Sequence, residues 1–384
     1  MAPRGRHASP QTYQRRRLVA ALVLVLVVAL VAFSVVALAS GSGSRQATTT
    51  TTPAHQATTT TAKAAQAVTM SFVGDTMLGS TPDLPPSPTT YLQAVIPSLA
   101  APTVFGNLEG TLTDSGDASK CGTSSSNCFA FRNPTSYAQN VYKAAGFTVM
   151  NSANNHSHDY GAQGVASTTQ ALQGAGIVQA GLPGQIGIAT QGTTKIAFVD
   201  FAPYSTTNNL LDLPGAKVLI DQAKSQANVV IVYMHAGAEG TDADHVTGSE
   251  EAYLGEDRGN AEAFAHAAID DGANLVVASG PHVLRGMQWY KGSLIAYSLG
   301  NFAGYQNFAT SGVLDLSMIL RVTLSGTGGF ESAHVTSLVL SGDAEPSVDS
   351  SGQAVSVVNQ LSTQDFGIGA AHIQANGDLL SPAG

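Results

Sequence analysis

The sequence predicts an α/β protein whose strands carry polar side chains at their carboxyl ends. Past residue 67, short apolar runs rich in β-branched residues alternate with Ala-rich stretches, which is the pattern of helices packed on a sheet. Residues 67–384 are long enough for one large domain with its own core. Five of the apolar runs lead directly into Asp, Glu, Asn or His, so the sheet should present a polar edge.

The N-terminal segment predicts a membrane anchor. Residues 1–17 contain five arginines and no acidic residue, and residues 18–39 contain no charge. A helix rises about 1.5 Å per residue, so residues 18–39 can cross a hydrocarbon core of about 30 Å. The arginines hold their end in the cytoplasm and direct the remainder outward. The alternative is a cleaved signal peptide, because Ala37-Leu38-Ala39 is typical of a cleavage site. Both alternatives place the domain outside the cell.

We therefore divide the chain into five parts. The linker is rich in Ser, Thr and Ala and cannot build a core, so it should act as an extended tether. Whether the C-terminal segment packs on the domain stays open. We expect a single-pass protein of the cell membrane with an extracellular C-terminal domain. The parts are a basic cytoplasmic tail (1–17), a transmembrane anchor (18–39), the linker (40–66), the large domain (67–342) and the C-terminal segment (343–384).

The charge balance limits the choice of partners. The chain has 26 acidic and 17 basic residues, a formal net charge of −9. This balance speaks against nucleic acid and against anionic lipid headgroups. An anionic substrate stays open, because a bound metal ion reverses the local field.

Two cysteines predict a disulfide. Cys121 and Cys128 are the only cysteines of the chain and flank a loop rich in Ser and Gly. In an oxidising compartment this spacing predicts one short structural disulfide, since two cysteines without a nearby His make a poor zinc site.

The polar residues at the strand ends predict one site. Each residue alone could be a helix cap or a turn residue. Together they are all of metal-ligand or acid–base type, and ligands bind at the carboxyl edge of such sheets. Asn301, in the strand-like run 295–302, is either a turn residue or a further member of the site. The runs 68–73, 103–105, 147–150, 229–234 and 275–277 lead into Asp75, Glu109, the pair Asn155–His156, His235 and His282.

These residues resemble the motifs of the CapA family, the poly-γ-glutamate capsule biosynthesis proteins. The motifs occur in the family's order from about residue 68 to residue 302. The resemblance implies a four-layer αββα sandwich of the metallophosphatase type, preceded by one transmembrane helix. The matching segments are FVGDTMLG (72–79), NLEGTLT (107–113), NSANNHSHDYG (151–161), HAGAE (235–239), GPHVLRG (280–286) and YSLGNF (297–302).

The resemblance also implies a role for each site residue. His156 would protonate the leaving oxygen, and Arg132 would clamp an anion, because guanidinium suits carboxylate and phosphate. The implied metal ligands are Asp75, Glu109, Asn155, His235 and His282, the catalytic residues His156 and Asp159, and the substrate-binding residues Arg132, Asn133, Glu239 and Asn301.

Two departures from the metallophosphatase pattern bear on the cofactor. Met77 and Gly280 stand where metallophosphatases have imidazoles. A thioether is a poor ligand for Mn²⁺ or Zn²⁺. The expected cofactor is therefore a divalent metal, Mn²⁺ or Zn²⁺, as one or two ions, and a metal-free site stays open.

The expected function is that of a CapA-type cell-surface protein. It would act in synthesis, export or retention of an anionic capsular or cell-wall polymer, by metal-assisted hydrolysis or transfer at a phosphoester or acyl centre. The alternative is a non-enzymatic assembly factor that binds the polymer at the same site. Expected partners are the polymer, the membrane and other membrane proteins of capsule synthesis.

Overall fold

The computed structural model describes residues 64–121 and 128–381. The predicted cytoplasmic tail, the predicted anchor at 18–39 and nearly all of the linker lie outside these residues. Within the described ranges, no helix combines the length and apolar character that a membrane span needs. The described residues belong to one compact unit.

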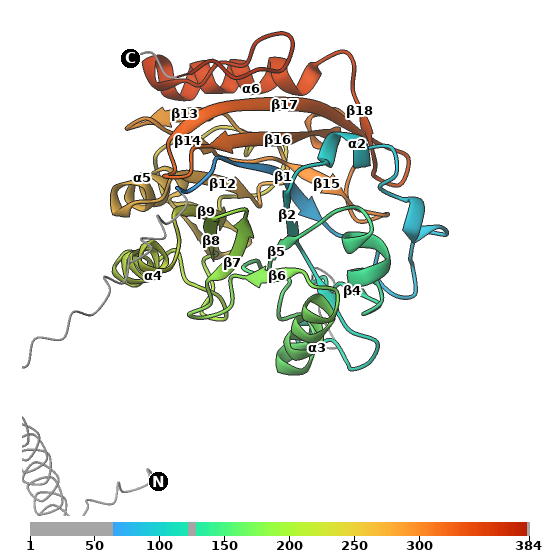
Figure 1. The fold of residues 1–384 in the computed structure, drawn as a ribbon. Coiled ribbons are helices and arrows are strands. Elements are labelled where there is room, and N and C mark those ends of the chain that lie inside the picture. The colour runs from blue at the N-terminus through green and yellow to red at the C-terminus, as the bar shows by residue number, and fades with distance from the viewer. Residues whose placement is uncertain (1–63, 122–127, 382–384) are drawn as a thin grey trace, which may run out of the picture. The chain divides into compact units, whose positions relative to one another are not determined.

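Two β-sheets form the framework of this unit (Figure 1). The eight-stranded sheet has the order β18-β17-β16-β1-β2-β5-β6, with β15 also paired to β1. The six-stranded sheet has the order β13-β14-β12-β9-β8-β7. The strands β1, β2, β5 and β6 run parallel in one sheet, as do β8, β9, β12 and β14 in the other. Their carboxyl ends therefore lie at a common edge in each sheet.

The first sheet holds β1 (Val68–Thr76), β2 (Thr103–Leu108), β5 (Val149–Asn151), β6 (Val178–Ala180), β15 (Asn301–Ala303), β16 (Leu316–Leu324), β17 (Phe330–Ser341) and β18 (Glu345–Val348). The second holds β7 (Gly187–Gln191), β8 (Thr194–Phe201), β9 (Val229–His235), β12 (Leu275–Ser279), β13 (Met287–Tyr290) and β14 (Ser293–Ala296). Two further pairs are β3 (Thr111–Leu112) with β4 (Arg132–Asn133), and β10 (Glu251–Tyr253) with β11 (Glu256–Gly259).

Helices cover the outer faces of both sheets, so the predicted α/β sandwich is confirmed. Buried side chains of α2, α3 and the short helix at Ala138–Lys143 pack on the first sheet. Those of α4 and α5 pack on the second sheet. Caps fix the ends of the latter pair: Asp212 and Asn260 accept N-terminal N–H groups, and Gly272 ends α5 with φ 112°. The helices are α2 (Ile96–Leu99), α3 (Gly161–Gly174), α4 (Leu213–Gln226), α5 (Ala261–Asp271) and α6 (Gln353–Phe366).

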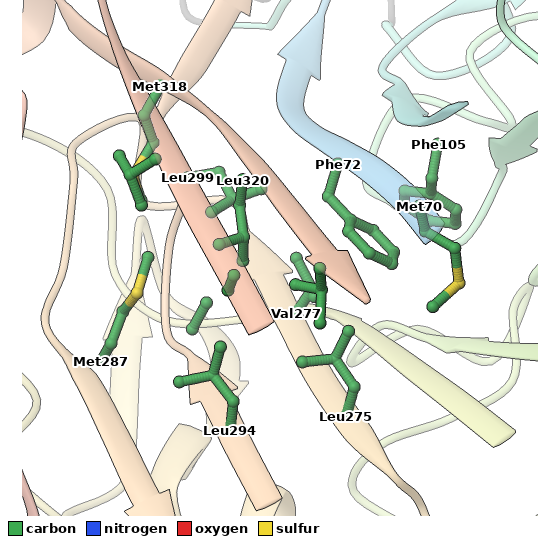
Figure 2. Packing of buried hydrophobic residues seen from close by; sticks show 14 of the residues in the cluster. Met70, Phe72, Phe105, Leu275, Val277, Met287, Leu294, Leu299, Met318 and Leu320 are labelled. Carbon is green, nitrogen blue, oxygen red and sulfur yellow. The ribbon is translucent and has the colours of Figure 1, made fainter. Parts of the chain in front are cut away.

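The main core lies between the two sheets. Figure 2 shows Phe72 of β1 and Val277 of β12 converging there from different sheets. The strands β9 and β12 are buried along their whole length, which explains their continuous apolar sequences. The two sheets therefore pack face to face and bring their carboxyl edges to the same end of the core.

The C-terminal segment belongs to the same unit. β18 extends the first sheet beside β17. Ala354 and Val358 of α6 are fully buried in the core between the sheets. In Figure 1, α6 lies along β17 and β13, which are near the edges of the two sheets. The question that the sequence left open is thus answered, because residues 343–381 close one side of the sandwich.

The predicted strand at 295–302 is wrong as a single element. Its first part belongs to β14 of the second sheet, and its last part to β15 of the first sheet. The chain crosses between the sheets at Gly300, which has φ 66°. A Cβ at Gly74 would collide with the carbonyl oxygen of Gly300, so β15 reaches β1 only because residue 74 is glycine. This crossing places Asn301 directly beside Asp75.

Candidate metal centre

Four of the predicted ligands meet where the two sheets present their carboxyl ends. Asp75 lies on β1, Glu109 follows β2, His235 ends β9 and His282 follows β12. His235 Nδ1 is 3.8 Å from Asp75 Oδ1, and His235 Nε2 is 3.7 Å from Glu109 Oε1. His282 Nδ1 is 3.2 Å from Asp75 Oδ2, and its Nε2 is 3.8 Å from Glu109 Oε1. These residues are far apart in the sequence, and the parallel strands bring them together.

The two carboxylates of this centre differ in their hydrogen bonding. Asp75 accepts from Asn107 Nδ2 at 2.7 Å, from Ser279 Oγ, and from Gly280 N at 3.2 Å. Glu109 is equally buried, yet neither of its oxygens has a hydrogen-bond partner. His235 Nε2 is also buried without a partner. Because unpaired buried polar atoms are costly, this set calls for a positive ligand.

The donor set fits a divalent cation. Asp75, Glu109 and His282 each offer one ligand atom, and these atoms lie within 4.8 Å of one another. Carboxylate and imidazole are common ligands of Zn²⁺, and carboxylate also suits Mn²⁺. His235 Nε2, which lies 3.7 Å from Glu109 Oε1, can add a further ligand atom when that nitrogen carries no proton.

Charges in this buried centre shift the pKa values in opposite directions. Burial lowers the pKa of His235 to about 3, so its imidazole is neutral and able to bind a metal. Burial and the neighbouring Asp75 raise the pKa of Glu109. Burial disfavours the imidazolium of His282, but Glu109 and Asp75 outweigh it and raise its pKa to about 10. The His282 proton thus supplies a positive charge where a cation would otherwise lie.

His156 and Asp159 form a hydrogen-bonded pair beside this centre. His156 Nδ1 is 2.7 Å from Asp159 Oδ2, which also accepts from Phe131 N at 2.7 Å. Lys120 Nζ lies 3.4 Å from Asp159 Oδ1. Burial lowers the pKa of His156, although Asp159 opposes the shift. Asp159 therefore fixes the orientation of the imidazole, and His156 lines the same pocket as His282.

Asn155 differs from the other predicted ligands in its surroundings. Its side-chain Oδ1 is buried without a partner, as expected of a ligand atom, while its backbone oxygen accepts from Lys120 Nζ at 2.8 Å. Its neighbour Asn154 has a structural role, because its amide donates to Asn107 Oδ1 and to Leu108 O.

Two asparagine side chains that the sequence did not single out form hydrogen bonds that lead to the centre. Asn151 Nδ2 donates to Asn107 Oδ1 at 2.6 Å. Asn107 Nδ2 in turn contacts Asp75 Oδ1 and lies 3.3 Å from His235 Nδ1. Both asparagines lie on strands, at the ends of β5 and β2, within segments that the family resemblance covers. Their position at the ends of these strands is the feature of the sequence that could have identified them as site residues.

A pocket of about 320 Å³ opens onto the centre. Its walls are largely aromatic: the Phe131 ring is 4.6 Å from that of His156, and the Phe308 ring is 5.4 Å from that of His282. Met77 lines the pocket where the metallophosphatase pattern has an imidazole. The pocket therefore offers apolar walls and two imidazoles, with no Lys or Arg among its described lining residues.

Two of the predicted substrate-binding residues reach this pocket. Asn301 Oδ1 is 2.8 Å from His282 Nδ1, so it orients that imidazole and is not a left-handed turn residue. Glu239 Oε2 is 3.8 Å from His282 Nε2, and its Oε1 is 2.8 Å from Arg258 Nη2. Both residues line the pocket.

The other two predicted substrate-binding residues do not reach it. Arg132 donates to Gly116 O at 3.0 Å and lies over the ring of Tyr160, so the structure does not support an anion clamp at this position. The amide nitrogen of Asn133 donates to Leu78 O and Gly79 O at 2.9 Å each, so both of its N–H groups are engaged by the backbone. The preceding segment contains the disulfide between Cys121 and Cys128, whose Cα atoms are 5.6 Å apart.

Fold and site together define a two-sheet α/β protein with a candidate metal centre at the strand carboxyl ends. The chain belongs to the bacterial capsule synthesis protein family PGA_cap, whose model matches residues 69–306. The resemblance to CapA proteins is thereby confirmed.

Individual relatives agree with this membership. The chain is 29% identical over 297 residues to the PGA biosynthesis protein CapA of Bacillus subtilis, covering 68% of this chain and 69% of the relative. It is 37% identical over 185 residues to the capsule biosynthesis protein CapA of Bacillus anthracis, covering 42% and 41%. A putative 5′-nucleotidase from Staphylococcus aureus is similar with a TM-score of 0.41 and 11% identity, covering 77% and 58%. The assignment rests on the family match and not on that weak structural similarity.

Proposed function

We propose that this protein binds a divalent cation at Asp75, Glu109, His235 and His282 and uses it on an anionic polymer of the poly-γ-glutamate type during capsule or wall synthesis. The observation that carries the proposal is Glu109, fully buried with two unpartnered oxygens that face two imidazoles. A cation satisfies these atoms and balances the two carboxylates.

The same residues support a hydrolysis or transfer reaction at a phosphoester or acyl centre. A bound divalent cation lowers the pKa of water and stabilises developing negative charge. His156, held by Asp159, would pass a proton to the departing oxygen or nitrogen. Phe131 and Phe308 supply aromatic wall beside His156 and His282 in the same pocket.

A non-enzymatic polymer-binding factor is the second candidate. Met77 lines the pocket where metallophosphatases place an imidazole, so the centre has fewer ligands than a two-metal hydrolase. In this candidate Asp75, Glu109 and His282 would hold the cation, which would supply positive charge for a polymer carboxylate, and no bond would be broken.

We also propose that the domain acts at the outer face of the cell membrane. The uncharged run 18–39 and the preceding arginines support a single span with the domain outside. The linker would then let the site reach the polymer at the cell surface.

A melting experiment on the full-length protein tests the cation centre. Mn²⁺ at about 100 times its dissociation constant should stabilise the fold by about 2.7 kcal/mol and raise the melting temperature. Glu109→Gln should abolish that increase and yet raise the melting temperature without metal, because it removes the repulsion between two buried carboxylates. Glu331→Gln, on the exposed edge of β17, is the matched control and should change neither.

A second measurement separates the two candidate functions. With Mn²⁺ bound, hydrolysis of a generic phosphodiester and of a γ-linked glutamate oligomer is measured for the wild type and for His156→Ala. Turnover that is lost in His156→Ala supports the enzyme. Oligomer binding without turnover supports the binding factor. A wild type whose melting temperature does not respond to any divalent ion would falsify the cation centre and both candidates with it.

A further inference from the structure

A second pocket of about 370 Å³ adjoins the first. Asn155 and Lys120 line it, and Lys120 Nζ is 3.4 Å from Nδ1 of His156, which lines the first pocket. On the opposite side, Arg258 joins the two pockets. Its Nη2 contacts Glu239 of the first at 2.8 Å and Glu256 of the second at 3.3 Å. Residues that line the two pockets are therefore linked twice, by the contact of Lys120 with His156 and through Arg258.

The chemistry of the second pocket differs from that of the first. Among the residues that the structure describes, Lys120 is the one Lys or Arg that lines either pocket. His158 and Tyr204 add an imidazole and a phenol to the same lining. The described lining of the first pocket combines aromatic rings with the carboxylate of Glu239 and several amides, and has no ammonium or guanidinium.

Lys120 is held in place and keeps donor capacity. Its Nζ donates to Asn155 O at 2.8 Å and lies 3.4 Å from Asp159 Oδ1. The backbone at Lys120 is also held in place, because Ser119 N and Lys120 N both donate to Asp159 O. An ammonium has three N–H donors, so one remains for a ligand. The side chain is 31% exposed, which lets that donor face the pocket.

We propose that the second pocket is a subsite for a carboxylate of the polymer, with Lys120 as the residue that pairs with it; this proposal rests on the proposed function. A single ammonium beside neutral donors matches one negative charge. A phosphate dianion would face the carboxylate of Glu256 in the same lining with only one cation to balance it. A linear polymer with regularly spaced carboxylates can place one on the cation and another on Lys120.

Binding of a fluorescent γ-linked glutamate oligomer to the full-length protein tests the subsite by fluorescence anisotropy. Lys120→Gln should weaken binding by about five-fold, the loss of one half-buried ion pair, and should reduce its salt dependence. Lys143→Gln is the matched control. Lys143 also donates to a backbone carbonyl but lines neither pocket, so its loss should leave binding unchanged.

A second variant, for which we expect the opposite change in oligomer affinity, tests the subsite if Lys120→Gln fails to fold. Glu256→Gln removes the one carboxylate of the pocket lining and should tighten oligomer binding. Unchanged affinity in either folded variant overturns the subsite. Stronger competition by inorganic phosphate than by glutarate would also overturn it, since the pocket would then prefer phosphate.

The Mn²⁺ melting shift, measured on the same variants, distinguishes this test from that of the metal centre. Lys120→Gln should retain the full shift, because Lys120 contacts none of the four ligands that we assign to the cation. A retained shift with unchanged oligomer affinity refutes the subsite alone. A wild type without any shift refutes the metal centre on which the subsite depends.

Discussion

Replacing Arg285 should destabilise the fold more than any surface charge would. Arg285 is fully buried after β12. Its Nη1 and Nη2 donate to the two oxygens of Glu251 at 2.9 and 2.6 Å, and its Nε donates to Ala243 O at 2.7 Å. Glu251 also accepts from Ala238 N at 2.9 Å. This pair ties the segment 240–259 to the loop that carries Glu239.

The magnitude follows from what the substitution leaves behind. In Arg285→Met, Glu251 keeps a side chain only 13% exposed and loses its cation. Removing one partner of a buried ion pair costs about 3–5 kcal/mol. Tyr253, which lines the first pocket, lies on the same segment, so oligomer binding should also weaken.

Urea unfolding followed by tryptophan fluorescence measures this cost. The chain has one tryptophan, Trp289, on β13 four residues after Arg285. The double variant Arg285→Met with Glu251→Leu should recover part of the loss, because no unpaired charge remains. Lys217→Met, which breaks surface pairs with Asp221 and Asp271, is the control and should move the midpoint far less. A loss below about 1 kcal/mol in Arg285→Met would refute the reasoning, since that is the value of a surface pair.

Three further predictions concern other parts of the chain. Burial raises the pKa of Asp200, whose two oxygens lack partners, so its pKa is higher in the folded than in the unfolded state. The wild type should therefore lose stability relative to Asp200→Asn as the pH rises from about 4 to 8. Melting temperatures of the two proteins that change in parallel with pH would contradict this prediction. Replacing both Cys121 and Cys128 by Ser should lower the free energy of unfolding by about 2–3 kcal/mol, and an unchanged urea midpoint would count against a structural disulfide. Protease added to intact cells should release a fragment beyond about residue 67, and a protected full-length protein would exclude the outward orientation.

The sequence was informative where local pattern and tertiary environment agree. β9 and β12 are buried on both faces, so their continuous apolar runs could be recognised without the structure. The segment 242–257 was not readable in this way, because its polarity is typical of a solvated loop. It contains β10 and the start of β11, and Arg258, the residue that follows the segment, is 3% exposed and pairs with Glu239. Ion pairs that permit charge burial depend on partners distant in sequence.

In the candidate site, too, some features could be predicted from the sequence and others could not. The residue types at the strand ends indicated Asp75, Glu109, His235 and His282, and the structure gathers these four. Lys120 gave no signal, because its position depends on the contact between residues 119–120 and Asp159. Arg132 shows the opposite error: its residue type suits an anion, but its side chain turns to Gly116 and Tyr160. Residue type can be read from sequence, whereas side-chain direction is decided by packing.

One of the two departures from the metallophosphatase pattern, Gly280, has a structural explanation. Gly280 has φ 117°, and a Cβ there would lie 3.1 Å from Ala236 N and 3.3 Å from His235 Nε2. A side chain at this position would therefore be strained and would force Ala236 and His235 to shift slightly, and His235 is itself a ligand in the proposed centre. The backbone N–H of Gly280 donates to Asp75 Oδ2 at 3.2 Å and helps to orient that carboxylate. Glycine at this position thus lets the backbone pass close to both Asp75 and His235, two of the four residues that we propose as ligands.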